Sequence, residues 1–234
     1  AAGPAPYAGI GMIQNSNDTD SAPLIFGKSR GTSTGSTTIV QDGDLLGRIE
    51  FQGMDGSDLE TGASIFGVVD GTPGSDDNYN VLIGDEAGTA ITTGDDNVAI
   101  GYAALDAEDT GSKSIAIGTN ALTAQNNDSN NYNIAIGHSA GLAITSGVRN
   151  VVIGGNALDA NTVGSKSVAI GYATLGTQNP TTATDMFNTA VGYEAGNAVT
   201  TGIQNTIIGA AAGDALTEGN YNTALGYAAL SADD

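Results

Sequence analysis

The chain has 234 residues, including 35 glycines, and 26 acidic against 6 basic side chains give it a formal net charge of −20. This charge argues against binding to a nucleic-acid backbone or an anionic membrane surface, because both need clustered Lys and Arg. The absence of cysteine excludes disulfides, thiolate metal sites and a thiol nucleophile, and no apolar run approaches the roughly 20 residues of a membrane-spanning helix.

The first third of the chain differs in composition from the rest. Residues 1–20 contain few large apolar side chains, which predicts an extended arm or linker. Residues 21–77 alternate short apolar runs with Gly and Asp turns and predict a small β-rich domain. We place the boundary between this domain and the next near residues 72–78.

Two elements stand out within this small domain. The stretch 37–51 predicts a β-hairpin with Asp42 and Gly43 at its turn, because Asp-Gly is a strong hairpin signal between apolar runs. Residues 63–77 predict a further strand that ends at a Gly/Pro break.

Residues 78–234 are organised by a repeat of three mostly apolar residues followed by glycine. Successive glycines are 17, 17, 19, 17, 17, 21, 17 and 17 residues apart. A helical repeat would need roughly 30 residues for its helix pair, so the spacing predicts a parallel β-solenoid with about nine 17-residue coils. The repeat glycines, which we expect to take a backbone conformation closed to other residues, are Gly84, Gly101, Gly118, Gly137, Gly154, Gly171, Gly192, Gly209 and Gly226.

Longer spacings recur after every third coil. They come from polar inserts at 123–131 and 177–185, which predict loops that leave the stack at one corner. A small polar residue, Asn or Ser, precedes each strand. Stacked asparagines favour amide ladders between coils over a ligand-binding role.

Each three-residue strand presents apolar residues on both faces. In Val98–Ala99–Ile100, the outer two side chains share one face and Ala99 takes the other. One face fills the coil, and the other forms an apolar stripe that predicts an interface between copies, with small middle residues allowing close approach. We predict that the third residue of each strand forms the repeat core, namely Ile83, Ile100, Ile117, Ile136, Ile153, Ile170, Val191, Ile208 and Leu225.

Several phrases resemble those of a known family. NVAIGYAAL, NIAIGHSAG and SKSVAIGYATL resemble the head repeats of trimeric autotransporter adhesins, and similar phrases occur in bacteriophage tail fibres. The resemblance implies a left-handed parallel β-roll in a homotrimer. The segment GKSRGTSTGSTTIVQDGDLLGRIEFQGMDGSDLETGASIFGVVDGTPG resembles a stretch common in phage tail fibres, where it lies upstream of a C-terminal chaperone that is cleaved off.

The fold class expected is therefore all-β, with a small β domain followed by a trimeric solenoid. The resemblance favours a non-catalytic, adhesive segment of a phage tail fibre in the extracellular virion tail. Its expected partners are its own copies, other tail proteins and a host-surface glycan or protein receptor. The alternatives are the head of a bacterial surface adhesin and, less favoured, a polysaccharide-degrading tailspike. Because the chain stops within a coil at LSADD, we expect a further C-terminal piece.

One motif points to an enzyme. GHSAG at 137–141 fits the G-x-S-x-G turn of serine esterases, with Ser139 as nucleophile beside the single histidine, His138. Sibling coils read GDEAG, GYEAG and GAAAG at the same place, so we interpret both glycines as repeat template and expect no catalytic residue.

Five weaker signals have plain structural interpretations. Gly27-Lys28-Ser29 lacks the upstream glycine of a phosphate-binding loop, and the acidic clusters at 55–60 and 76–77 lack calcium-loop spacing, so we expect no cofactor or metal. Lys113 and Lys166 are expected to pair with acids of neighbouring coils or chains. Thr189, Thr206 and Thr223 stack too briefly for an ice-binding surface. Packing along the coil corner is favoured over sugar binding for Tyr102, Tyr172, Tyr193 and Tyr227.

Overall fold

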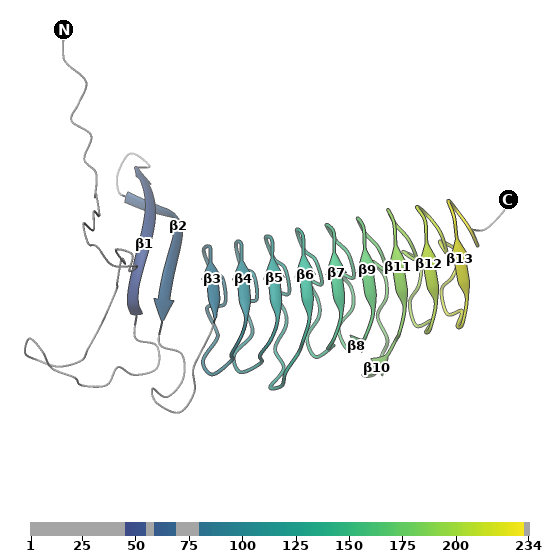
Figure 1. Ribbon diagram of the computed structural model, residues 1–234, viewed down its shortest axis with the longest axis horizontal. Coiled ribbons are helices and arrows are strands. Elements are labelled where there is room, and N and C mark those ends of the chain that lie inside the picture. Colours follow the sequence, from purple (N-terminus) through teal and green to yellow (C-terminus); the bar gives the residue numbers. More distant parts are fainter. Residues whose placement is uncertain (1–44, 55–58, 69–79, 232–234) are drawn as a thin grey trace, which may run out of the picture.

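The computed structural model describes residues 45–54, 59–68 and 80–231, with side chains from residue 80 onward, and within these ranges every regular element is a β-strand. Two ten-residue strands, β1 (Leu45–Met54) and β2 (Leu59–Val68), precede a row of short strands that form a ladder (Figure 1). The ladder strands are β3 (Val81–Ile83), β4 (Val98–Ile100), β5 (Ile115–Ile117), β6 (Ile134–Ile136), β7 (Val151–Ile153), β9 (Val168–Ile170), β11 (Thr189–Val191), β12 (Thr206–Ile208) and β13 (Thr223–Leu225).

The short strands form one parallel ladder, which confirms the predicted β-solenoid of about nine coils. Each strand pairs in register with its equivalent in the next coil, as Val98, Ala99 and Ile100 do with Ile115, Ala116 and Ile117. We call each ladder strand a rung. Equivalent positions therefore stack directly above one another along the whole array.

The antiparallel pair β1–β2 continues the same sheet. β2 pairs with β1 along its length and with β3 through Ile65 and Ile83, which makes an eleven-stranded sheet. The domain boundary expected near residues 72–78 lies outside the described residues. The sequence prediction placed residues 45–51 in a hairpin with 37–41. In the structure residues 45–51 pair with β2, and the predicted partner strand and the Asp42–Gly43 turn lie outside the described residues.

The repeat glycines are confirmed as positions that only glycine fills. Their φ angles lie between 120° and 138°, a range that L side chains rarely adopt. A Cβ built on any of the first eight would also lie 2.2–2.7 Å from backbone atoms of the next coil's glycine. The glycine column therefore lets successive coils approach at the spacing of a parallel sheet.

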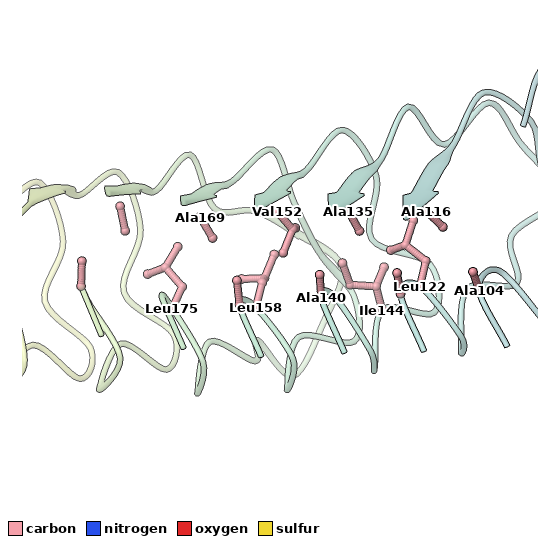
Figure 2. Packing of buried hydrophobic residues seen from close by; sticks show 14 of the residues in the cluster. Ala104, Ala116, Leu122, Ala135, Ala140, Ile144, Val152, Leu158, Ala169 and Leu175 are labelled. Atoms are coloured by element: carbon pink, nitrogen blue, oxygen red, sulfur yellow. The ribbon is translucent and has the colours of Figure 1, made fainter. Parts of the chain in front are cut away.

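The predicted repeat core was assigned to the wrong face of the strand. The middle residues, such as Ala99, Ala135 and Val152, are fully buried, whereas the third residues are partly exposed. The interior is a thin layer in which alanines of the sheet face leucines and isoleucines of the opposite turn layer (Figure 2). The side chains that lie on the outer face instead are Ile83, Ile100, Ile117, Ile136, Ile153, Ile170, Val191, Ile208 and Leu225.

The turn layer supplies about one large apolar side chain per coil, from either of two positions. The fourth residue after the repeat glycine is Leu or Gly, and the seventh is either polar or apolar. Where the fourth residue is Gly141, the seventh is Ile144, whose Cδ1 would lie 2.9 Å from a Cβ at Gly141. Where the fourth residue is Leu122, the seventh is the buried Gln125. Gly–apolar and Leu–polar pairs are thus alternative ways of filling one space.

Buried amides link successive coils beside the rungs. The Asn150 side-chain oxygen accepts the Ser167 N–H at 2.9 Å, and its amide donates to the Gly164 carbonyl at 3.1 Å. This confirms the interpretation of the asparagines as ladders between coils, although most of the bonds run to backbone groups. Each Asn therefore satisfies polar groups that would otherwise be buried without partners.

Glutamines complete the ladder where serine replaces asparagine. Gln125 donates to the Ser114 hydroxyl at 2.9 Å and accepts from the Asn133 amide at 2.8 Å. Gln178 bridges Ser167 and Asn188 in the same way. Both glutamines belong to the lengthened coils, which explains why serine and the insert recur together every third coil.

The inserts leave the stack and then rejoin it. Asn130 of the first insert forms a parallel bridge with Ser112. In the second insert, β10 (Thr184–Asp185) pairs in parallel with β8 (Gly164–Ser165), while residues 181–183 stay exposed. The loops predicted at 123–131 and 177–185 are therefore anchored to the coil before them.

Adjacent glycines offer a matched test of the close stacking. We expect Gly154→Ala to lower the free energy of unfolding by at least about 2 kcal/mol, because the new Cβ meets the Gly171 carbonyl oxygen at an unfavourable φ. Gly155→Ala should change it by less than about 0.5 kcal/mol, since its Cβ has only ordinary contacts, the nearest at 3.6 Å. Urea denaturation followed by circular dichroism measures both. Equal losses in the two variants would contradict the stacking argument.

Candidate functional site

The rungs present one continuous outer face, four columns of side chains wide. It consists of the residue before the buried Asn or Ser, the first and third residues of the rung, and the residue after the repeat glycine. In the β4 coil these are Asp96, Val98, Ile100 and Tyr102, and each is at least partly exposed, whereas Asn97 and Ala99 between them are buried. The period-2 alternation of the strand places Val98 and Ile100 on the same side. Asp96, at φ 57°, and Tyr102, which follows Gly101, flank the rung at its two ends. We call this surface the outer face.

The two central columns of the outer face are apolar over most of their length. They contain Val or Ile in nearly every rung, and Ile136, Ile208 and Leu225 are among the most exposed large apolar residues of the described chain. The predicted threonine column, Thr189, Thr206 and Thr223, takes the first position of the last three rungs. Its neighbours on each rung are apolar, as expected from the sequence.

The outer columns form two edges of different character. We call the column before the buried Asn or Ser the N-edge and the column after the repeat glycine the C-edge. The N-edge from β4 to β13 consists of Asp96, Lys113, Tyr132, Arg149, Lys166, Phe187, Gln204 and Tyr221. Over the same rungs the C-edge consists of Tyr102, Thr119, His138, Gly155, Tyr172, Tyr193, Ala210 and Tyr227.

The N-edge holds every basic side chain that the structure describes. The Arg149 guanidinium lies 5.9 Å from the centroid of Tyr132, and the Lys166 ammonium 5.2 Å from that of Phe187. Lys113 is 3.4 Å from Asp96 of the previous coil, and Lys166 pairs with Asp185 of the insert. The pairing of both lysines with acids of neighbouring coils is thus confirmed.

Two of the four C-edge tyrosines stack on one another along the solenoid. The rings of Tyr172 and Tyr193 lie 5.5 Å apart with an interplanar angle of 15°. Hydrogen bonds with Glu86 and Glu194 raise the pKa values of Tyr102 and Tyr193, respectively, above 10. Rings stacked on one another present edges and hydroxyls rather than open faces. For Tyr172 and Tyr193, this favours packing along the corner over a platform for sugar rings.

Ser139 has no catalytic surroundings. It is nearly buried, has φ 53°, and its N–H donates to the Thr119 carbonyl, as the equivalent N–H of Asn156 does to His138. The next positions are a turn and not the helix that a nucleophile elbow needs. Gly137 and Gly141 are therefore glycines of the solenoid repeat and do not form a nucleophile elbow.

A buried carboxylate lies inside the solenoid, and sequence reasoning missed it. Glu108 is fully buried and accepts four hydrogen bonds, from the Gly111 and Asn127 N–H groups and from the Gln125 and Asn131 amides, at 2.8–3.3 Å. Burial raises its pKa above 4.5 despite these donors. The signal available in the sequence was its slot, seven residues after the repeat glycine, which holds the polar Gln125, Asn161 and Gln178 in other coils that carry Leu at the fourth position.

Other predicted motifs fall partly or wholly outside the described residues. Gly27-Lys28-Ser29 and the acidic cluster at 76–77 lie there, as do the arm at 1–20 and the side chains of 55–60. In the part of the chain that is described, no group of three or more His, Asp or Glu side chains is placed to hold a metal ion. No helix long and apolar enough to cross a membrane occurs in that part either.

Comparison with known proteins found no match to a family model, to a curated protein or to a solved structure. The fold and the outer face therefore carry the functional argument.

The buried Glu108 predicts the direction in which stability changes with pH. Because burial raises the pKa of Glu108, the folded chain keeps a proton that the unfolded chain releases, so this group costs stability as pH rises from about 4.5 through the raised pKa. Relative to Glu108→Gln, the free energy of unfolding of the parent chain should fall over that range and then level off. Thermal denaturation of both proteins from pH 4 to 8 measures the difference. A difference that grows with pH would mean that the four donors outweigh burial.

Proposed function

We propose that this chain is a structural and adhesive segment of a bacteriophage tail fibre, assembled as a homotrimer through the outer face. The observation that carries the proposal is the continuous apolar stripe along nine rungs, flanked by aromatic edges. Its other partners in this proposal are neighbouring tail proteins and a glycan or protein receptor on the host surface. The resemblance of the repeats and of residues 27–74 to tail-fibre sequences supports the choice of phage over other extracellular fibres.

The size of the outer face supports assembly. Nine rungs at about 4.8 Å give the apolar stripe a length of about 43 Å. An exposed apolar stripe of that length is typical of an interface between chains.

Several features support a role without catalysis. Hydrolysis of a polysaccharide needs two carboxyl groups that face the substrate. The acids at the edges of the outer face are engaged instead, Asp96 with Lys113 and Glu194 with Tyr193. The buried Glu108 is closed off by its four donors. Incubation with host polysaccharide should leave the chain length of that polysaccharide unchanged.

A second candidate has specific support. The same repeats resemble the heads of bacterial trimeric adhesins, which would place the chain on a bacterial outer surface. Gold-labelled antibody against the purified chain, applied to virions and to cells from the same source, separates the two. We expect label on virion tails. Label confined to the cell surface would replace the phage proposal with the adhesin.

Assembly through the outer face can be tested by mass. Light scattering should give about three times the chain mass of 23.2 kDa for the parent protein. Ile153→Glu should yield monomers with an unchanged circular dichroism spectrum, because it places a charge in the middle of the apolar stripe. Thr201→Glu is the matched control, since Glu218 occupies the same slot one coil later on an exposed turn outside the outer face. A monomeric parent protein would overturn the assembly.

A further inference from the structure

We propose that three successive coils form a calcium-binding site over Gly176. Its protein ligands are the Asp159 carboxylate from the coil after β7, the Ala173 carbonyl from the coil after β9 and the Asn197 side-chain oxygen from the coil after β11. This site belongs to the single chain and depends neither on the proposed assembly nor on a role in a fibre.

Gly176 leaves a gap in a column of side chains. It is the fifth residue after the repeat glycine, a slot that holds Asp159 in the coil before it and Asn197 in the coil after it. Its φ is not among the positive values found at the repeat glycines, so the local backbone does not require glycine. What the missing side chain provides is space between two polar neighbours.

Three oxygen atoms surround this gap. A Cβ built on Gly176 would lie 2.6 Å from the Asn197 Oδ1, 3.2 Å from the Ala173 carbonyl oxygen and 3.5 Å from the Asp159 Oδ1. No other glycine that the structure describes has oxygens as all three of its nearest atoms in this way. Oxygens that converge without a hydrogen-bond donor between them repel one another, which favours a cation in the gap.

The Asp159 carboxylate has no basic side chain to balance its charge. Backbone N–H groups of Asp159 and Ala160 hydrogen-bond it, and no ion pair among the described residues includes it. The three basic side chains of the described region all lie on the N-edge. The equivalent acid three coils earlier, Asp106, accepts a hydrogen bond from the Thr89 hydroxyl, whereas the coil before Asp159 has Leu142 in that slot. A bound cation would supply the charge that Asp159 lacks nearby.

Hydrogen bonds between the coils hold the ligands in place. The Gly176 N–H donates to the Ala173 carbonyl at 3.3 Å, and the second lone pair of that oxygen is left for a cation. The N–H and the hydroxyl of Thr177 both donate to the Asn197 carbonyl, which ties the backbone of Asn197 to the coil before it. The site is therefore built at the lengthened coil that carries the insert 177–185.

The donor set favours calcium over magnesium. Ca²⁺ takes roughly six to eight oxygens from carboxylates, amides, carbonyls and water in flexible geometry, whereas Mg²⁺ needs a near-ideal octahedron and gives up its waters reluctantly. One carboxylate and two neutral oxygens would bind here, and water would complete the shell. With a single charged ligand we expect a dissociation constant of about 0.1–1 mM. The site contains one acid, so it differs from the clusters of three acids that the described residues lack.

Thermal unfolding of the whole chain with CaCl₂ tests the site. In about 150 mM NaCl, about 10 mM CaCl₂ should raise the unfolding temperature by about 2–4 °C, because a ligand that binds only the folded state stabilises it. Asp159→Asn should abolish this rise, since it removes the one charged ligand and keeps the side-chain volume. The matched control Asp106→Asn removes a charge from the same slot three coils earlier and should retain the rise.

Two further measurements identify the kind of site. We expect Asn197→Asp to lower the calcium dissociation constant about tenfold by isothermal titration calorimetry, because it adds a second carboxylate. Weaker binding by this variant would overturn the proposal and show that the Asn197 amide donates to Asp159. An equal rise with MgCl₂ would reveal only screening of the −20 charge and would overturn it too. The same holds if the parent chain does not respond to calcium, or if Asp159→Asn responds as the parent does.

Discussion

Stacking of identical backbone paths at the spacing of a parallel sheet is the constraint on which the rest of this structure depends. At the repeat glycines the backbone of one coil lies so close to the next that a Cβ would overlap it. Buried backbone polar groups must then find partners in the coil above or below or within their own turn, as the Ile144 N–H does with the Gly141 carbonyl. The asparagine and glutamine amides beside the rungs meet that requirement.

The thin interior imposes a second constraint, on volume. Small side chains of the sheet face about one large side chain per coil from the turn layer. A leucine four residues after the glycine fills the space and leaves the seventh position to a polar side chain, as in Leu122 and Gln125. A glycine at the fourth position leaves space that an apolar residue at the seventh position fills, as with Gly141 and Ile144. These alternative pairs, together with the inserts that carry the glutamines, produce the repeat of three coils.

The repeat made the architecture predictable, because period, strand and turn residues recur in every coil. The inner and outer faces could not be assigned in the same way. A three-residue strand with apolar side chains on both faces does not reveal which face the turn layer covers, and the larger Ile100 appeared the better core residue than Ala99. The opposite layer already supplies the bulk, so alanine fits inside. Glu108 was missed because its burial depends on donors from the insert that follows it.

A uniform backbone leaves the side chains as the main difference between coils, and they vary under the influence of the coils above and below. On the N-edge, Lys113 pairs with Asp96 of the previous coil, and Arg149 lies against Tyr132. On the C-edge, Tyr172 stacks on Tyr193. Contacts between successive coils therefore extend from the buried amides to the exposed edges of the outer face, so the stacking that orders the interior also orders this surface.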